Sequence, residues 1–205
     1  MGQGASPHRF EGTTLTDWLL ARDPSTRVLS VSRKDRGAIL PIGKSKAQVF
    51  WYSPAREGEG TGAFVTSSYY ASELPQWVRD FNERRIPQSF AGKSWDLLRP
   101  ASEYPEPDTV EIENLGRDFV FPHLAPEDSA AIAYLLPNYP WSDELTLQLA
   151  LEGVKRLELG AGDRTDLLAV SLSGMDGIGH AFGPDSREVH DHMLRLDRML
   201  GAFLD

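Results

Sequence analysis

An aspartate and a histidine near the end of the sequence form its most promising pair for chemistry. Asp176 and His180 stand in the glycine-rich stretch 171–186, SLSGMDGIGHAFGPDS. The pattern Asp-x-x-x-His offers one carboxylate oxygen and one imidazole nitrogen, a donor combination that suits zinc or another divalent ion. The glycines would let the backbone bend so that both side chains converge. On spacing alone a structural role stays open, in which Asp176 caps the next segment and His180 hydrogen-bonds a carbonyl.

The elements that must position this pair are a buried strand and the helices on either side of it. Residues 165–173, TDLLAVSLS, form a near-continuous apolar run, which is typical of a strand covered on both faces. The last helix is predicted from an apolar stripe made up of Val189, Met193, Leu196, Leu200 and Phe203. Helix, strand, loop and helix form the unit of an α/β fold with a mostly parallel central sheet flanked by helices. Because such sheets bind ligands at the carboxyl ends of their strands, we expect Asp176 and His180 in a loop at that edge, pointing into a common space.

The first half of the chain supplies the other predicted strands. They cover residues 27–32, 48–53 and 63–70, which are rich in β-branched and aromatic side chains. The glycine-rich stretch 56–62 between the last two strands predicts a hairpin. Residues 38–43, AILPIG, follow the first strand and are expected to pair with it or to continue it.

Three helices are predicted around these strands. Thr14 and Asp17 match a capping box, which predicts a short helix that ends near Arg22. Apolar residues at helical spacing predict a second helix within 74–85. A third helix is expected to begin at Ser142, where a serine and two acidic residues suit a helix N-terminus.

Residues 86–141 differ in character from the rest of the chain. Eight of the 14 prolines of the chain lie in this stretch, and its apolar residues follow neither a helical nor a strand period for long. We interpret this stretch as a cap or insertion that crosses the surface of the fold, and residues 1–205 as one domain.

The composition excludes several classes of function. The chain has 21 basic and 30 acidic residues, a formal net charge of −9, and no long basic run, which disfavours nucleic acid as the main partner. It has no cysteine, which excludes a thiolate nucleophile and any Cys-ligated metal centre. No apolar stretch approaches 18 residues, so we expect no membrane span.

Several motifs together resemble a known family. The segment DGIGHAFG, residues 176–183, is similar to the Asp-x-x-Gly-His-x-x-Gly segment of the alkaline phosphatase superfamily. More narrowly, the chain resembles the branch that includes type I phosphodiesterases and the monomeric, phosphate-irrepressible alkaline phosphatases of bacteria. The resemblance runs in order from about residue 5 to the last residue and includes residues 31–43, 50–53, 64–70 and 74–82.

The resemblance implies a zinc-dependent phosphoester hydrolase that acts on a small phosphorylated substrate. Asp176 and His180 match the residues that hold one of two zinc ions, and Lys34 and Arg36 match the basic pair that contacts the substrate phosphoryl group. Residues two apart in an extended segment point the same way, so an ammonium and a guanidinium could reach one phosphate. Without the resemblance, a solvated face would be the default reading of this pair. We expect Lys34 and Arg36 to line the same concavity as Asp176, in a protein exported to the periplasm or the medium.

Other parts of the family pattern have no match in this sequence. The threonine or serine nucleophile, a later Asp-His pair and a final histidine are missing, so no catalytic residue is assigned. The 205 residues are expected to be a fragment of a partial hydrolytic domain, inactive alone. His190 and His192 stand two apart on a predicted helix and are expected at its surface or in its packing. His8 and His123 are expected in segments of low order.

Three alternatives to a phosphomonoesterase stay open. The chain could belong to a phosphodiesterase or nucleotide pyrophosphatase, or to a sulfatase or phosphate mutase of the same superfamily. It could also be a non-catalytic remnant that serves as a binding or structural module. Lys34 and Arg36 favour the monoesterase, because two cations suit a dianionic phosphate better than a singly charged diester.

Overall fold

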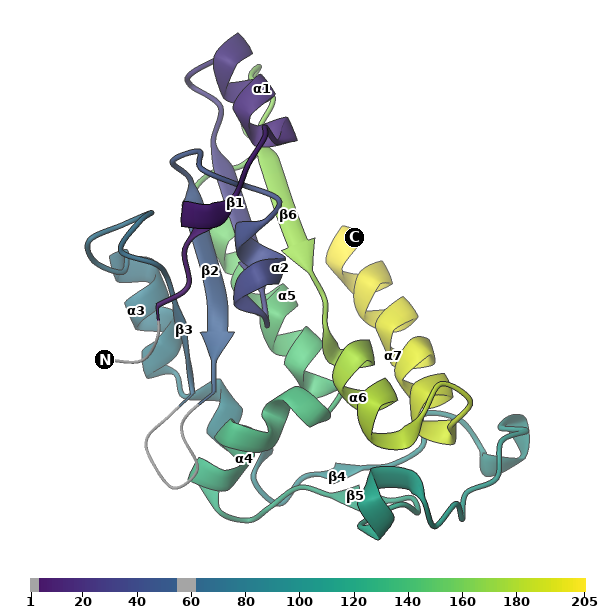
Figure 1. Cartoon of the computed structure of the whole chain (residues 1–205). Coiled ribbons are helices and arrows are strands. Elements are labelled where there is room, and N and C mark those ends of the chain that lie inside the picture. Colours follow the sequence, from purple (N-terminus) through teal and green to yellow (C-terminus); the bar gives the residue numbers. More distant parts are fainter. Residues whose placement is uncertain (1–3, 55–61) are drawn as a thin grey trace. The chain divides into compact units, whose positions relative to one another are not determined.

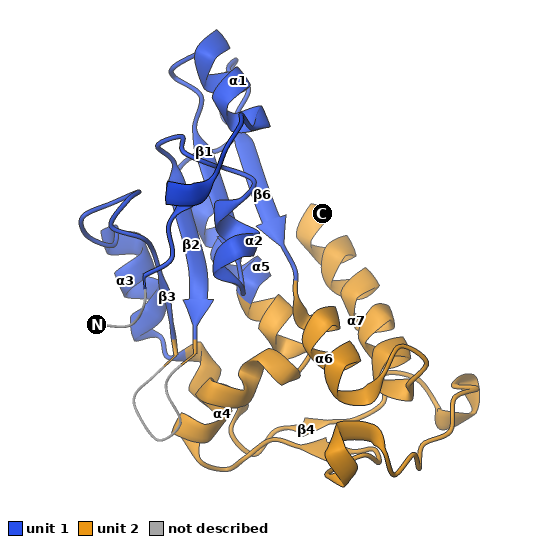
Figure 2. Cartoon of the chain, viewed as in Figure 1, with its two compact units in different colours: residues 1–53, 63–85, 146–172 blue, residues 54–62, 86–145, 173–205 orange. Residues whose placement is uncertain are grey.

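A four-stranded sheet organises the first of the two compact units into which the chain divides. The computed structural model describes residues 4–54 and 62–205. Unit 1 comprises residues 1–53, 63–85 and 146–172, and unit 2 comprises residues 54–62, 86–145 and 173–205 (Figure 2). Within the described residues no helix is both long and apolar enough to cross a bilayer.

The sheet of unit 1 is mostly parallel, as predicted. Its strands lie in the order β3 (Ala63–Val65), β2 (Gln48–Ser53), β1 (Val28–Ser32) and β6 (Leu167–Ser171). β1 pairs in parallel with β2 and with β6, so that Val31 lies opposite both Phe50 and Val170 (Figure 1). β3 pairs antiparallel with β2, which confirms the predicted hairpin, although most of its turn lies outside the described residues.

The position of β6 corrects one expectation. Every residue of β1 is buried, whereas every residue of β6 is only partly buried, and β6 lies at the edge of the sheet in the part of the chain that the structure describes. The prediction that residues 165–173 form a strand covered on both faces is therefore wrong for these residues. An apolar run indicates that the faces of a strand can be buried, but it does not show how completely other elements cover them.

Helices pack on both faces of β1 because its side chains alternate. Leu29 points toward α5 (Trp141–Arg156), where a Cβ on Gly153 would lie 2.4 Å from its Cδ2 atom. Ser30 points toward α2 (Asp35–Ile39) and donates its hydroxyl to the carbonyl oxygen of Ala38 at 2.8 Å. Since residues 29 and 30 of a strand face opposite ways, α2 and this part of α5 cover opposite faces of the strand.

α2 overturns the expectation that residues 38–43 pair with or continue the first strand. Asp35–Ile39 is a helix, and its residues Ala38 and Ile39 are buried with Ile42, Val28 and Val49 in a core cluster. Short apolar runs do not distinguish a buried helix from a strand, which explains the error.

The other helix predictions for unit 1 are confirmed. α1 (Leu15–Arg22) begins with the capping box, in which the Thr14 N–H donates to Asp17 at 2.7 Å. α3 (Gln76–Glu83) buries Val78 and Phe81, and the ring of Phe81 lies 5.9 Å from that of Phe64 in β3. A short 3₁₀ helix, η1 (Pro7–Arg9), precedes α1.

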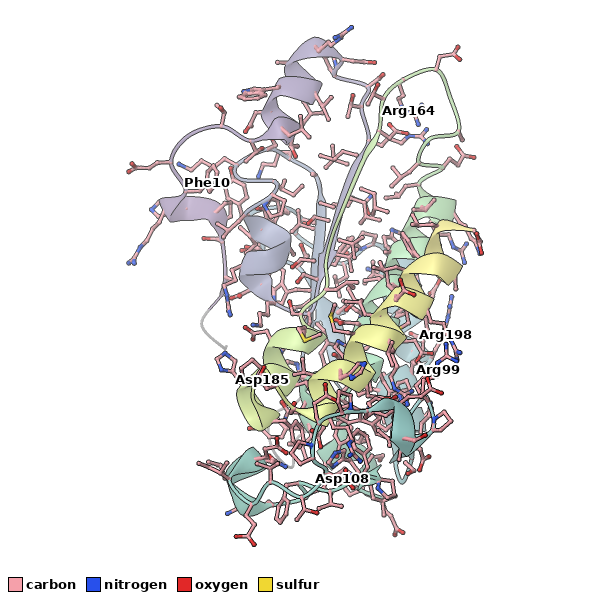
Figure 3. The ribbon with its side chains drawn as sticks, turned by 90° about the vertical axis from the view of Figure 1, so that its right-hand side faces the viewer. Phe10, Arg99, Asp108, Arg164, Asp185 and Arg198 are labelled. Carbon is pink, nitrogen blue, oxygen red and sulfur yellow. The ribbon has the colours of Figure 1, made fainter. Side chains whose placement is uncertain are left out.

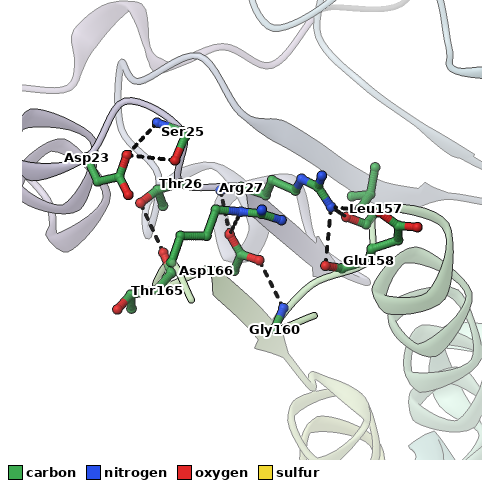
Figure 4. Close-up of polar contacts among 10 residues, drawn as sticks. Asp23, Ser25, Thr26, Arg27, Leu157, Glu158, Gly160, Thr165 and Asp166 are labelled. Atoms are coloured by element: carbon green, nitrogen blue, oxygen red, sulfur yellow. Dashed lines mark hydrogen bonds and ion pairs between the residues drawn. The ribbon is translucent and has the colours of Figure 1, made fainter. Parts of the chain in front are cut away.

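One carboxylate joins the beginnings of β1 and β6. Asp166 accepts N–H groups from Arg27 at 2.8 Å and from Gly160 at 2.9 Å, and it pairs with Arg164 at 2.8 Å (Figure 4). Burial opposes ionisation, but the hydrogen bonds outweigh it and lower the pKa of Asp166. The charged side chain therefore fixes the loop before β6 against the loop before β1.

Unit 2 contains short elements followed by longer helices. The proline-rich part holds the antiparallel strands β4 (Ser94–Trp95) and β5 (His123–Leu124), the helix α4 (Ser129–Leu135), and four 3₁₀ helices: η2 (Ile86–Phe90), η3 (Ala101–Glu103), η4 (Glu113–Gly116) and η5 (Leu136–Asn138). The helices α6 (Gly174–Phe182) and α7 (Arg187–Leu204) complete it, with the first residues of α5. A cap role for residues 86–141 stays a prediction.

The buried face of α7 is polar, contrary to the predicted apolar stripe. Glu188, Asp191 and His192 are buried, whereas Met193 is 52% exposed and Leu200 is 38% exposed. At the first residue of the helix, Arg187 forms an ion pair with Asp108 at 3.3 Å (Asp108 is labelled in Figure 3). The predicted stripe is therefore only partly buried: Val189, Leu196 and Phe203 are half-buried, and the fully buried positions of the helix are polar.

Several hydrogen-bond donors stabilise the buried carboxylate of Asp191. Its carboxylate accepts hydrogen bonds from Trp95 Nε1 at 2.7 Å, the Leu98 N–H at 2.7 Å and the Tyr104 hydroxyl at 2.8 Å. Arg195, one turn along α7, adds its Nε atom at 2.5 Å. Buried charge is tolerated when it is paired and hydrogen-bonded in this way.

Candidate active site

Asp176 and His180 lie on one side of a helix. Both belong to α6, and His180 Nε2 is 3.6 Å from Asp176 Oδ1. The side chain of Asp176 is 48% exposed and that of His180 is 83% exposed, so both are accessible to a ligand. The expectation of a loop is wrong, because Gly174, Ile178 and Phe182 recur every four residues and are buried along one face of the helix. This spacing of four residues is present in the sequence, although the glycines of the same stretch favour a loop.

A buried carboxylate from α5 fixes the start of this helix. Asp143 Oδ1 accepts the N–H groups of Ser173 at 3.0 Å and of Gly174 at 2.9 Å, and Asp143 Oδ2 lies 3.2 Å from His192 Nε2. An acidic side chain suits the amino end of a helix, where N–H groups lack partners. The sequence indicated Asp143 only as an acidic residue at the start of its own helix.

Gly174 permits this close approach. A Cβ atom at Gly174 would lie 2.6 Å from Asp143 Oδ2 and 3.0 Å from His192 Nε2. In contrast, a Cβ at Gly179 would meet only Val189, at 4.0 Å. The first glycine is therefore required for packing, and the second is not.

Lys34 and Arg36 occupy different kinds of backbone. Lys34 is the N-cap residue of α2 and is extended, whereas Arg36 belongs to the helix itself. The inference that two alternate residues of an extended segment point the same way is therefore wrong here. Both residues still follow the carboxyl end of β1 directly, and the Lys34 N–H donates to Ser32 Oγ at 3.0 Å. They lie in unit 1 and Asp176 lies in unit 2, so a shared concavity stays a prediction.

The histidines outside the pair have well-defined surroundings. His192 is fully buried against Asp143, and His190 Nδ1 lies 3.0 Å from Glu106. The expectation of low order is wrong for His123, which belongs to β5 and is 1% exposed. Over residues 4–54 and 62–205 no group of three or more metal-binding side chains comes together.

The buried His123 lies among three acidic residues, of which Glu113 and Glu188 are buried and Asp118 is partly exposed. His123 Nε2 lies 2.9 Å from Glu188, and Nδ1 lies 3.3 Å from Asp118. Burial alone would lower the pKa of His123, but the hydrogen bond to Glu188 and the charge of Asp118 outweigh it and raise the pKa. Burial and the charge of Glu188 raise the pKa of Glu113 to about 7.

Comparisons with known proteins identify the relatives of this chain. A family model described as type I phosphodiesterase / nucleotide pyrophosphatase matches residues 6–205. Alkaline phosphatase PafA of Elizabethkingia meningoseptica is 40% identical over 208 residues, and alkaline phosphatase PhoV of Synechococcus elongatus is 38% identical over 207 residues. These alignments cover 98% of this chain but only 37% and 36% of the two relatives.

Solved structures agree with this relationship. The crystal structure of wild-type alkaline phosphatase PafA is similar with a TM-score of 0.80 and 37% identity, over 92% of this chain and 37% of that one. A PafA mutant in which a threonine, an asparagine, a lysine and an arginine are replaced gives a TM-score of 0.81 and 38% identity, with the same coverage.

The glycines of α6 give a matched pair of stability tests. We expect Gly174→Ala to lower the free energy of unfolding by about 1–3 kcal/mol, because the new methyl group must displace Asp143. Gly179→Ala has room for its methyl group and should leave the free energy unchanged or raise it by up to about 1 kcal/mol, because alanine favours the helix. Urea denaturation of both variants measures the difference. Equal effects at the two positions would contradict the packing role of Gly174.

The raised pKa of Glu113 predicts a pH-dependent stability. The neutral carboxyl is favoured in the folded protein, so its contribution is complete below the ordinary pKa of 4.5 and is lost as the pH rises through about 7. Glu113→Gln cannot ionise and should gain stability relative to the natural protein between pH 5 and pH 8. Urea denaturation at both pH values checks this, with the exposed Glu111→Gln as control. A constant difference between Glu113→Gln and the natural protein would refute the assignment.

Proposed function

The chain belongs to the type I phosphodiesterase / nucleotide pyrophosphatase family of the alkaline phosphatase superfamily, and from this membership we propose that the protein is a zinc-dependent phosphomonoesterase. The observation that carries the proposal is the Asp176–His180 pair, which lies one helix turn apart at 3.6 Å in a segment that begins directly after β6. Relatives named alkaline phosphatase support a phosphomonoester as substrate. Export to the periplasm or the medium is part of the same proposal.

The donor set of the pair fits one zinc ion in part. A carboxylate oxygen and an imidazole nitrogen are two of the ligand types that zinc prefers, and catalytic zinc normally has three protein ligands. When bound, the metal would supply Lewis acidity to an oxygen of the phosphoryl transfer. Asp176 would contribute negative charge and His180 a neutral nitrogen, and both side chains are exposed enough to bind it.

The activity is proposed for the whole protein. The chain spans 37% of the length of PafA, and no nucleophile is assigned within it. We place the nucleophile and the remaining metal ligands outside the 205 residues, and we expect this stretch to be inactive by itself. Without a nucleophile the covalent step has no acceptor for the phosphoryl group.

Lys34 and Arg36 are proposed to bind the phosphoryl group of the substrate. Both follow the carboxyl end of β1, where sheets of this kind bind ligands. The PafA mutant whose structure is solved has its substituted lysine and arginine two positions apart, the same spacing as Lys34 and Arg36. Two cations suit the dianionic phosphate of a monoester better than a diester.

A phosphodiesterase is the second candidate. The family model that matches the chain is described by phosphodiesterase and nucleotide pyrophosphatase activities. Two cations near the phosphate would then be less useful, because a diester carries a single negative charge.

A comparison of two substrates tests the proposal. The protein from the complete reading frame should hydrolyse p-nitrophenyl phosphate faster than bis-p-nitrophenyl phosphate, lose activity with a chelator and regain it with zinc. Asp176→Ala should lower kcat/KM by two orders of magnitude or more, since losing a residue that only supports a metal ligand already costs about 10–100-fold. The exposed Asp185→Ala serves as control. Full activity of Asp176→Ala would overturn the metal role.

The basic pair has a separate test. Lys34→Ala combined with Arg36→Ala should lower kcat/KM for the monoester by roughly 10²–10³-fold, because each group stabilises phosphoryl charge. The loss for the diester should be smaller, and the exposed Arg22→Ala should have no effect. Equal losses for both esters would favour the phosphodiesterase.

A further inference from the structure

A cavity in unit 2 lies outside the residues assigned to the reaction. It has a volume of about 260 Å³ and is lined by residues of β4, η4, β5, α4, η5 and α6 and of the loops beside them. Pockets for drug-sized ligands hold about 300–1,000 Å³, so this cavity suits a more compact molecule. The rings of Tyr139 and Phe182 form part of its wall.

The charges around the cavity cancel. Arg117 and Asp118 are adjacent in sequence and both line it. His123 also lines it, and its charge is balanced by the buried carboxylate of Glu188 at 2.9 Å. A site for a simple anion or cation keeps an excess of the opposite charge, which this one lacks.

The lining of the cavity includes hydrogen-bond acceptors, hydrogen-bond donors and groups that do both. The carboxylate of Asp118 only accepts, the guanidinium of Arg117 only donates, and the amides of Asn114 and Asn138 do both. A hydroxyl group both donates and accepts, so a molecule with several hydroxyls can use all of these partners. Its C–H face can pack on the aromatic wall, where apolar surface is buried.

Two of the polar residues adopt left-handed backbone. Asn114 has φ 46° and Asp118 has φ 47°, a conformation that asparagine and aspartate tolerate better than most residues. Asp118 also contacts His123 at 3.3 Å, which helps to hold its carboxylate at the cavity.

We propose that this cavity binds a neutral, polyhydroxylated ring the size of a single sugar. Asp118, Arg117 and the two asparagines hydrogen-bond the hydroxyl groups, and Tyr139 with Phe182 packs against the ring. The binding uses residues of unit 2 alone and none that hold metal or phosphate, so it can be measured whether or not the protein is a phosphatase.

Binding of D-glucose to the whole protein tests the proposal. We expect saturable binding by ligand-observed NMR, weakened about tenfold in Asp118→Ala and in Asn138→Ala, because each substitution removes about one well-made hydrogen bond to the ligand. Leu135→Phe, which adds bulk to the lining, should abolish binding in a protein that is still folded by circular dichroism. Asp185→Ala, exposed in the turn between α6 and α7, should bind as the natural protein does (Figure 3).

Three results would overturn the proposal. The first is absence of D-glucose binding at 50 mM, a concentration at which even weak sites of about 10 mM affinity are mostly filled. The second is binding that Asp118→Ala, Asn138→Ala and Leu135→Phe all leave unchanged. The third is preferential binding of inorganic phosphate or tetramethylammonium at the same residues, which would make this a site for a charged ligand.

Discussion

The carboxylate of Asp143 is the interaction on which the candidate active site depends. It accepts two N–H groups at the start of α6 and contacts His192, and all of these groups are buried. Removing one partner of such a buried network costs about 3–5 kcal/mol, because the remaining groups lose their compensation. Asp176 and His180 lie on the first two turns of the helix that this carboxylate starts. Their direction is thus set by a residue outside the pair, through the backbone at the start of the helix.

Local signals in the sequence predicted the parts of the fold that local forces determine. The capping box at Thr14 and the strand at residues 48–53 are stabilised by groups close in the chain or by a strongly β-forming run, and both were confirmed. The core sheet and its parallel pairing followed from the order of strands and helices. The Asp176–His180 pair was found from residue type and spacing, and the structure adds the helix that holds it.

The failures concern positions whose environment comes from distant segments. His123 looked unremarkable in a proline-rich stretch, and its partner Glu188 is 65 residues away. The helix α7 was predicted from its hydrophobic period, whereas its buried Asp191 is stabilised by donors from residues 95–104. No pattern within one helix reports partners of that kind. Buried polar networks are therefore the feature that single-sequence reasoning misses most readily.

The hydrogen bonds to Asp191 restrict which side chains can replace this residue and its donors. Its two oxygens receive Trp95, Leu98, Tyr104 and Arg195 together, so an asparagine there would turn one acceptor into a donor facing another donor. A phenylalanine at position 104 would remove one of the two hydrogen bonds that Asp191 Oδ1 accepts and would leave only that from the Leu98 N–H. The side chains of Trp95, Tyr104 and Arg195 are therefore the positions at which a substitution alone should be costly, whereas position 98 supplies only its backbone N–H.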